Sequence, residues 1–149
     1  MTRKAIFLSL LLAIGLFSGC SSDDGEVTAI YHLLDENGQE TSDFNQGDKI
    51  QFELVITNST NHTIECDDWK QLVNDAFLVY NSEGKIFNPI LTEELIYRPI
   101  IIKHGEQFCH RLIWPWDAVP LSEGKYHSVC TLAVNGASTK TYTIDFSIR

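Results

Sequence analysis

The fold class predicted by the sequence is an all-β, immunoglobulin-like antiparallel sandwich of about seven strands. Apolar and polar residues alternate over residues 50–56 and again near the C-terminus, as expected for strands with one buried face. Turn residues separate such segments at short intervals, and Asn135-Gly136 between two alternating runs is the strongest hairpin signal. Many short strands with frequent turns favour a sandwich over an α/β fold.

Seven segments carry the strand pattern. They cover residues 27–34, 49–58, 62–66, 76–81, 108–114, 125–134 and 140–148. Helix is expected only as single turns at 68–73 and 92–97. The stretch Glu123-Gly124-Lys125-Tyr126 is typical of the corner tyrosine of Greek-key sandwiches, so Tyr126 is expected to be buried with its hydroxyl bonded to nearby backbone.

The N-terminal segment predicts export and lipid attachment. Arg3 and Lys4 precede an apolar run over residues 6–17, which is the pattern of a secretory signal peptide. Small residues directly before Cys20 resemble a bacterial lipobox, so Cys20 is the expected lipid attachment site, carrying palmitate among its acyl chains. The alternative is a plain signal peptide followed by an ordinary cysteine.

The predicted organisation has three parts: a signal peptide over 1–19, a lipidated tether over 20–26 and the sandwich domain over 27–149. The tether is polar and acidic and resembles the export tag of Bacteroidetes lipoproteins displayed on the cell surface, although a plain flexible linker has the same composition. The expected location is therefore the bacterial outer membrane, lipid-anchored, with surface exposure as one of two orientations.

The charge of the chain excludes some partners. Eleven basic and twenty acidic residues give a net charge of −9, and the signal peptide contains two of the basic residues and none of the acidic ones. The mature chain is therefore still more acidic and repels phosphates and acidic headgroups. No nucleic-acid partner is expected, and membrane attachment is expected through the lipid anchor alone.

Three thiols remain when Cys20 is lipidated. Cys66 and Cys130 alternate in phase with the inward-facing residues of their strands, so both thiols are expected inside the sandwich. This favours a disulfide between them, and two buried free thiols are the alternative. Cys109 and His110 face opposite sides of one strand, so they do not form a nucleophile and its base. The histidines lack metal-binding spacing. We therefore predict no enzyme, no catalytic residue, no metal and no cofactor.

Aromatic residues near loops are the candidates for partner contact. Trp69, beside Asp67 and Asp68, and Trp116, before a loop, offer rigid contact area at the ends of the sandwich. Trp114 falls at a strand position whose side chain faces inward, so it is expected in the core.

Several stretches together resemble the BsuPI-type proteinase inhibitor domain over residues 49–134. They are Gly105-Glu106 before a strand ending in Trp114-Pro115-Trp116-Asp117, the stretch 120–126, the early strand 52–58, and Phe77-Leu78-Val79-Tyr80 followed by Gly84-Lys85 as a middle hairpin. The sequence departs from that family at 66–71 and at 87–91. The resemblance implies an immunoglobulin-like sandwich and inhibition of a protease through an exposed loop.

Two functional hypotheses follow. In the first, the chain is a lipid-anchored binding module of the cell envelope that contacts a protein, such as a protease, through an exposed loop between Asn81 and Ile101. In the second, it is an accessory lipoprotein for carbohydrate binding, adhesion or envelope assembly, with exposed Trp69 and Trp116 rings stacking on a glycan. The partner itself is not identified by the sequence.

Overall fold

The structure is a computed structural model that describes residues 25–88, 99–134 and 137–149. Several predictions fall outside these residues: the signal peptide, Cys20 and most of the tether, the helical turn at 92–97 with most of the loop between Asn81 and Ile101, and the Asn135-Gly136 turn itself.

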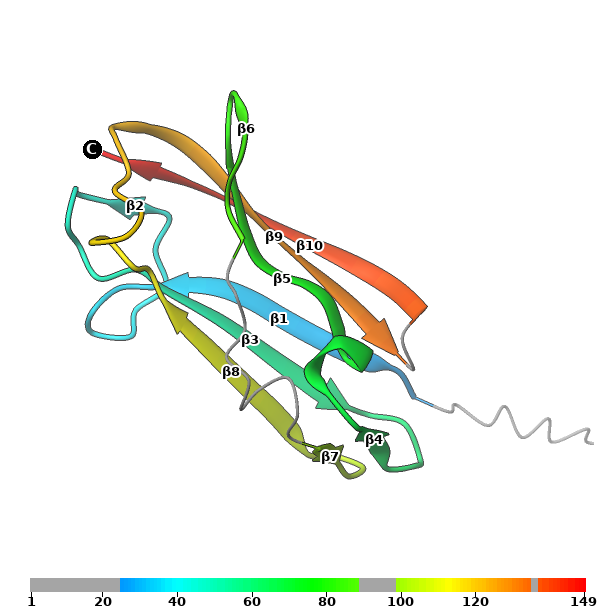
Figure 1. Cartoon of the computed structure of the whole chain (residues 1–149). Coiled ribbons are helices and arrows are strands. Elements are labelled where there is room, and N and C mark those ends of the chain that lie inside the picture. The colour runs from blue at the N-terminus through cyan, green and yellow to red at the C-terminus, as the bar shows by residue number, and fades with distance from the viewer. Residues whose placement is uncertain (1–24, 89–98, 135–136) are drawn as a thin grey trace, which may run out of the picture.

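The described strands form two facing sheets and a small third pair (Figure 1). The first sheet has the order β1 (Val27–Leu34), β3 (Gln51–Asn58) and β8 (Gln107–Ile113). The second has the order β2 (Asp43–Phe44), β10 (Ala137–Ile148), β9 (Gly124–Val134), β5 (Val73–Asn81) and β6 (Gly84–Phe87). The third pairs β4 (Ile64–Cys66) with β7 (Ile100–Ile102), and a 3-10 turn, η1 (Trp69–Gln71), precedes β5. The prediction of an all-β immunoglobulin-like sandwich is confirmed.

The seven predicted strands are all present, with ends within three residues of those expected. β9 and β10 pair antiparallel on both sides of residues 135–136, which confirms the predicted hairpin. The three strands without a predicted segment, β2, β6 and β7, are two to four residues long. The hairpin of β5 and β6 was expected only from the BsuPI-type resemblance.

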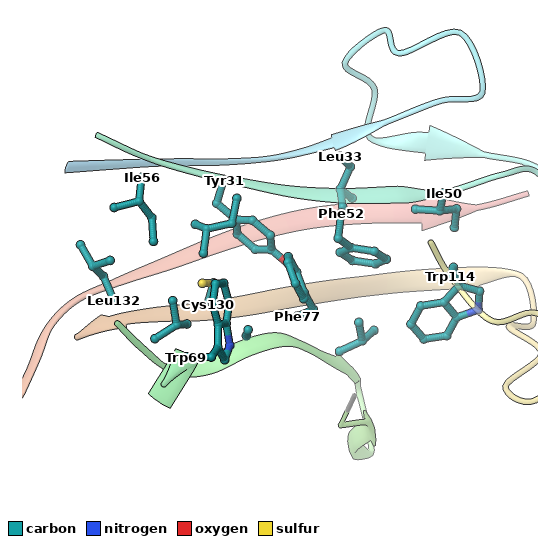
Figure 2. Packing of buried hydrophobic residues seen from close by; sticks show 14 of the residues in the cluster. Tyr31, Leu33, Ile50, Phe52, Ile56, Trp69, Phe77, Trp114, Cys130 and Leu132 are labelled. Carbon is teal, nitrogen blue, oxygen red and sulfur yellow. The ribbon is translucent and has the colours of Figure 1, made fainter. Parts of the chain in front are cut away.

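The core fills the space between the sheets, and Figure 2 shows its side chains. Phe52, Leu54 and Ile56 alternate on one face of β3 and are completely buried. Phe52 meets Phe146 of the opposite sheet edge to face, with ring centroids 6.2 Å apart. Such aromatic contacts add to the stabilisation from apolar burial, which makes this contact a strong link between the sheets.

One buried hydroxyl pair also joins the sheets. The Oγ of Ser128 on β9 donates to the Leu78 carbonyl at 2.9 Å, and it lies 2.6 Å from the hydroxyl of Tyr31 on β1. Because the single serine proton goes to Leu78, Tyr31 donates to Ser128. Burial raises the pKa of Tyr31, so this phenol stays protonated and keeps its role as donor.

Tyr126 is the corner tyrosine that the sequence predicted. Its ring is buried at 7 % exposure, and its hydroxyl donates to the Ser122 carbonyl at 2.7 Å. The bond joins the start of β9 to the loop that precedes it, which confirms the structural role expected for this residue.

β5 departs from simple alternation. Residues 76–79 are all buried, and Phe77 has a φ of 58°, in the left-handed region that bulky residues rarely adopt. The pairing of β5 with β9 shifts register here. This bulge turns Phe77 into the core against Tyr31 and Phe52, with ring centroids 5.8 and 6.2 Å apart.

Candidate functional site

Trp69 does not lie on the surface. Its indole has 0 % exposure and packs against Phe108 and His110 of β8, with ring centroids 5.7 and 4.9 Å apart. The prediction that Trp69 contacts a partner is therefore wrong, because side chains of β8 cover the ring. Figure 2 shows Trp69 among the core side chains.

The other predicted contact residues do not assemble into one surface. Asp68 is half-buried and caps η1, because its Oδ1 accepts from the Gln71 amide at 3.1 Å. Asp67 is exposed beside it. Trp116 is half-buried in the connection between β8 and β9, where its Nε1 donates to the Asp48 carbonyl at 2.6 Å. Since Trp69 is buried, the expected pair of exposed tryptophan rings is absent, whereas Trp114 lies in the core as predicted.

Cys66 and Cys130 are both buried free thiols. The predicted disulfide between them is therefore not present, and the alternative of two small apolar side chains describes the structure. Burial raises the pKa of both thiols, that of Cys130 to about 12. Neither group is a thiolate at neutral pH, as a nucleophile would have to be.

The outer face of the three-stranded sheet carries a network of polar side chains centred on Glu53. His32, Glu53 and Arg111 are neighbours across β1, β3 and β8. Glu53 accepts from His32 Nε2 at 2.8 Å, from Arg111 Nε and from the Cys109 thiol at 3.2 Å. Burial raises the pKa of Glu53, but these three bonds outweigh it and lower the pKa to about 2.

This network lowers the reactivity of Cys109, although the residue is exposed. Burial of the sulfur and the bond to Glu53 both raise its pKa, which favours the neutral thiol. The polar groups on this face therefore satisfy one another, and the arrangement is structural.

Two hollows lie at the end of the sandwich opposite Val27, which we call the distal end. It contains the end of β1 at Leu34, β2, the turn between β5 and β6, and the C-terminus (Figure 1). The smaller hollow, of about 390 Å³, is lined by residues of the connection between β1 and β2, including Asp35 and Glu40. Asp35 Oδ1 accepts hydrogen bonds from the backbone amides of Asn37 and Gln39, both at 2.8 Å, so this carboxylate stabilises the turn to which it belongs.

The larger hollow, of about 750 Å³, is a wide groove on the outer face of the five-stranded sheet, which we call the distal groove. Its floor contains two cross-strand pairs of β9 and β10, Lys125 with Ser147 and His127 with Asp145. Asp43 of β2 and Asn81 at the end of β5 flank this floor.

Several polar groups in the distal groove lack partners in the described structure. The side chains of Lys125 and Asp145 make no hydrogen bond or ion pair with a described residue. His127 makes only a ring contact, stacking on Tyr80 with centroids 4.9 Å apart and planes 4° apart. Asn81 uses its side-chain oxygen to accept from the amides of Glu83 and Gly84, which leaves its amide nitrogen without a described partner.

Within residues 25–88, 99–134 and 137–149, no group of three or more His, Cys, Asp or Glu side chains is placed to hold a metal ion. No helix in this described part is long and apolar enough to cross a membrane.

Comparisons with known proteins add little to this picture. No protein-family model matches the sequence, and no curated protein matches it. Among solved structures, the chain is similar to the CARDB domain of the PF1109 protein of Pyrococcus furiosus, solved in complex with di-metal ions. That alignment has 12 % identity, covers 83 % of this chain and 88 % of that one, and has a TM-score of 0.49. The likeness is too distant to carry an argument about ligand or activity.

The distal groove was not predicted from the sequence. A signal was present, because Lys125, His127, Asp145 and Ser147 have the outward parity of their strands. Which of these side chains lie opposite one another depends on the register between β9 and β10, and the sequence does not predict that register.

Proposed function

We propose that this chain is a lipid-anchored binding module of the bacterial cell envelope, held in the outer membrane through acyl groups on Cys20. The observation that carries the proposal is the position of two surface hollows of the described residues at the distal end, away from the start of β1, which follows the tether. A protein held at its N-terminus presents this end to partners.

The dimensions of the sandwich support this arrangement. β1 has eight residues, and a strand rises about 3.3 Å per residue, so Val27 and Leu34 lie roughly 23 Å apart. Six residues separate Cys20 from Val27. This short tether would hold the Val27 end near the lipid headgroups and leave the distal groove facing away from them.

The proposed role is recognition without catalysis. The pKa values of Cys66, Cys109 and Cys130 are all raised, chiefly by burial, which disfavours a nucleophilic thiolate. Burial lowers the pKa of His110, which is half-buried on the inward face of β8, away from Cys109. These groups therefore support a structural role.

Lipid attachment is tested by metabolic labelling of the full chain with an alkyne fatty acid in a bacterial host, followed by membrane fractionation. The wild type should carry the label and sediment with the outer membrane, and Cys20→Ser should lose both properties. Cys109→Ser is the matched control and should keep the label. An unlabelled wild-type chain would refute the anchor.

Inhibition of a protease is a second proposal, in line with the BsuPI-type resemblance. What supports it is the hairpin of β5 and β6, which the resemblance expects: Ser82 and Glu83 are exposed in its turn, and Lys85 is exposed on β6 (Figure 1). The test is a panel of serine proteases incubated with the full chain in detergent micelles. Inhibition at a stoichiometric dose is expected, and an unchanged rate for every enzyme would refute this second proposal.

A further inference from the structure

We propose that the distal groove binds a neutral oligosaccharide, an inference that rests on the proposed role of the chain as a binding module. The groove volume of about 750 Å³ lies in the range of small-ligand sites, which span roughly 300–1,000 Å³. It is a wide surface groove that suits an extended chain of several sugar rings.

The polar groups of the groove suit a ligand rich in hydroxyl groups. Lys125 and the amide nitrogen of Asn81 can only donate hydrogen bonds, and the carboxylate of Asp145 can only accept them. His127 has one nitrogen of each kind when neutral. None of these polar groups has a hydrogen-bond or ion-pair partner among the described residues. A sugar hydroxyl both donates and accepts, so it satisfies either type.

The charges in the groove favour a neutral ligand. Asp43 accepts from Ser147 at 2.5 Å and pairs with Arg149 at 3.0 Å, which compensates its carboxylate. Lys125 and Asp145 then leave one charge of each sign on the floor. A phosphorylated or acidic ligand would meet these carboxylates and the negative charge of the whole chain, so it is disfavoured.

The floor also disfavours a peptide partner. β9 is hydrogen-bonded to β10 on one side and to β5 on the other, so its backbone has no free edge for strand addition. The apolar side chains in the groove, Tyr126 and Phe146, are 7 % and 3 % exposed and offer no pocket for a hydrophobic anchor.

The paired rings of Tyr80 and His127 complete the site. They stack with nearly parallel planes, and both are half-buried, so each supports the other in a fixed orientation on the sheet surface. Stacking covers one face of each ring, so the pair does not offer a ligand a broad flat surface. Its contribution is to hold the imidazole of His127 in place beside the neighbouring polar side chains of the groove.

The test uses the full chain in detergent micelles and immobilised hexasaccharides. The neutral probes are hexamers of α-1,4-linked glucose, β-1,4-linked glucose and α-linked mannose, and the charged probes are a phosphorylated mannose hexamer and a galacturonate hexamer. At least one neutral probe should bind. The double variant Lys125→Ala with Asp145→Ala should weaken that binding by at least about tenfold, the loss that 1.4 kcal/mol produces.

The matched control is Lys103→Ala with Glu65→Ala, which removes the same two charges from exposed positions on and beside the strands of the third pair. It should bind as the wild type does. The inference is overturned if no neutral probe binds, if only charged probes or an immobilised peptide library bind, or if both double variants behave alike. None of these results affects lipid attachment, which the fatty-acid label tests separately.

Discussion

The outer faces of the two sheets differ in how their polar side chains are used. On the three-stranded sheet, His32, Arg111 and Cys109 all donate to one carboxylate, that of Glu53, which is only 6 % exposed. On the five-stranded sheet, Lys125 and Asp145 lie in the distal groove without a hydrogen-bond or ion-pair partner among the described residues.

The difference separates groups that stabilise the fold from groups available to a ligand. A buried carboxylate has lost its hydrating water and depends on hydrogen bonds from the protein. Removing either the carboxylate or its donors therefore lowers the stability of the fold. An exposed and unpaired ion is already solvated and contributes little to stability. A surface with unpaired groups of both signs beside a groove is therefore a better candidate for recognition than a surface whose charges neutralise one another.

The largest effect is expected from Glu53→Ala, which breaks the polar network on the outer face of the three-stranded sheet; we call this surface the paired face. The change removes the common acceptor of three donors, and hydrogen bonds to a charged group are worth roughly 1.5–3 kcal/mol. Because Arg111 is more than half exposed and can be hydrated again, we expect a loss of about 2 kcal/mol in the free energy of unfolding. Urea denaturation measures it, and a loss no larger than that of Glu65→Ala at an exposed site would contradict the structural role.

The pH dependence of stability sharpens the same contrast. The pKa of Glu53 is about 2 in the folded chain and 4.5 as its ordinary value. A lowered folded pKa means that the stabilisation is fully present above pH 4.5 and is lost as the pH falls towards 2. The difference in unfolding free energy between wild type and Glu53→Gln should therefore shrink over this window. A difference that stays constant from pH 6 to pH 2 would show that the charge of Glu53 is not what stabilises the fold.

Much of the fold was predictable because alternation of period two is a local property. β1 was predicted at its observed bounds, and the hairpin of β9 and β10 was predicted from Asn135-Gly136. β2 was not, because two residues cannot display an alternation, and β7 was not, because its three residues, Ile100–Ile102, are all apolar.

The candidate site was less predictable because it depends on contacts between distant residues. Trp69 has polar neighbours in sequence, yet Phe108 and His110, about forty residues away, bury it. The distal groove depends on a bulge between Ser138 and Lys140 that shifts the register of β10. A regular continuation of the pairing of Val134 with Ala137 would place His127 opposite Ile144, whereas the bulge places it opposite Asp145.

Thiol reactivity gives a smaller effect on the paired face. Under native conditions we expect iodoacetamide to modify Cys109 only, and slowly, because Cys66 and Cys130 are buried and Glu53 favours the neutral form of Cys109. Glu53→Gln should raise the rate several-fold at pH 8, as followed by mass spectrometry, and Cys109→Ser should remove the reaction.

Unfolding the wild type without a reductant extends this measurement to the buried pair. All three thiols should then react, because Cys66 and Cys130 are free in the structure. A single modification would instead reveal a disulfide between those two residues and would restore the pairing that the sequence favoured.

The smallest effect is expected in the distal groove. Lys125→Ala and Asp145→Ala should each change the free energy of unfolding by less than about 0.5 kcal/mol, as is usual for surface substitutions away from special features. The reason is that neither side chain has a described partner to lose. Urea denaturation of both variants beside Glu53→Ala gives the comparison directly. A cost of 2 kcal/mol for Asp145→Ala would mean that the five-stranded face is held together by its charges as the other face is, and the physical distinction between the two faces would be lost.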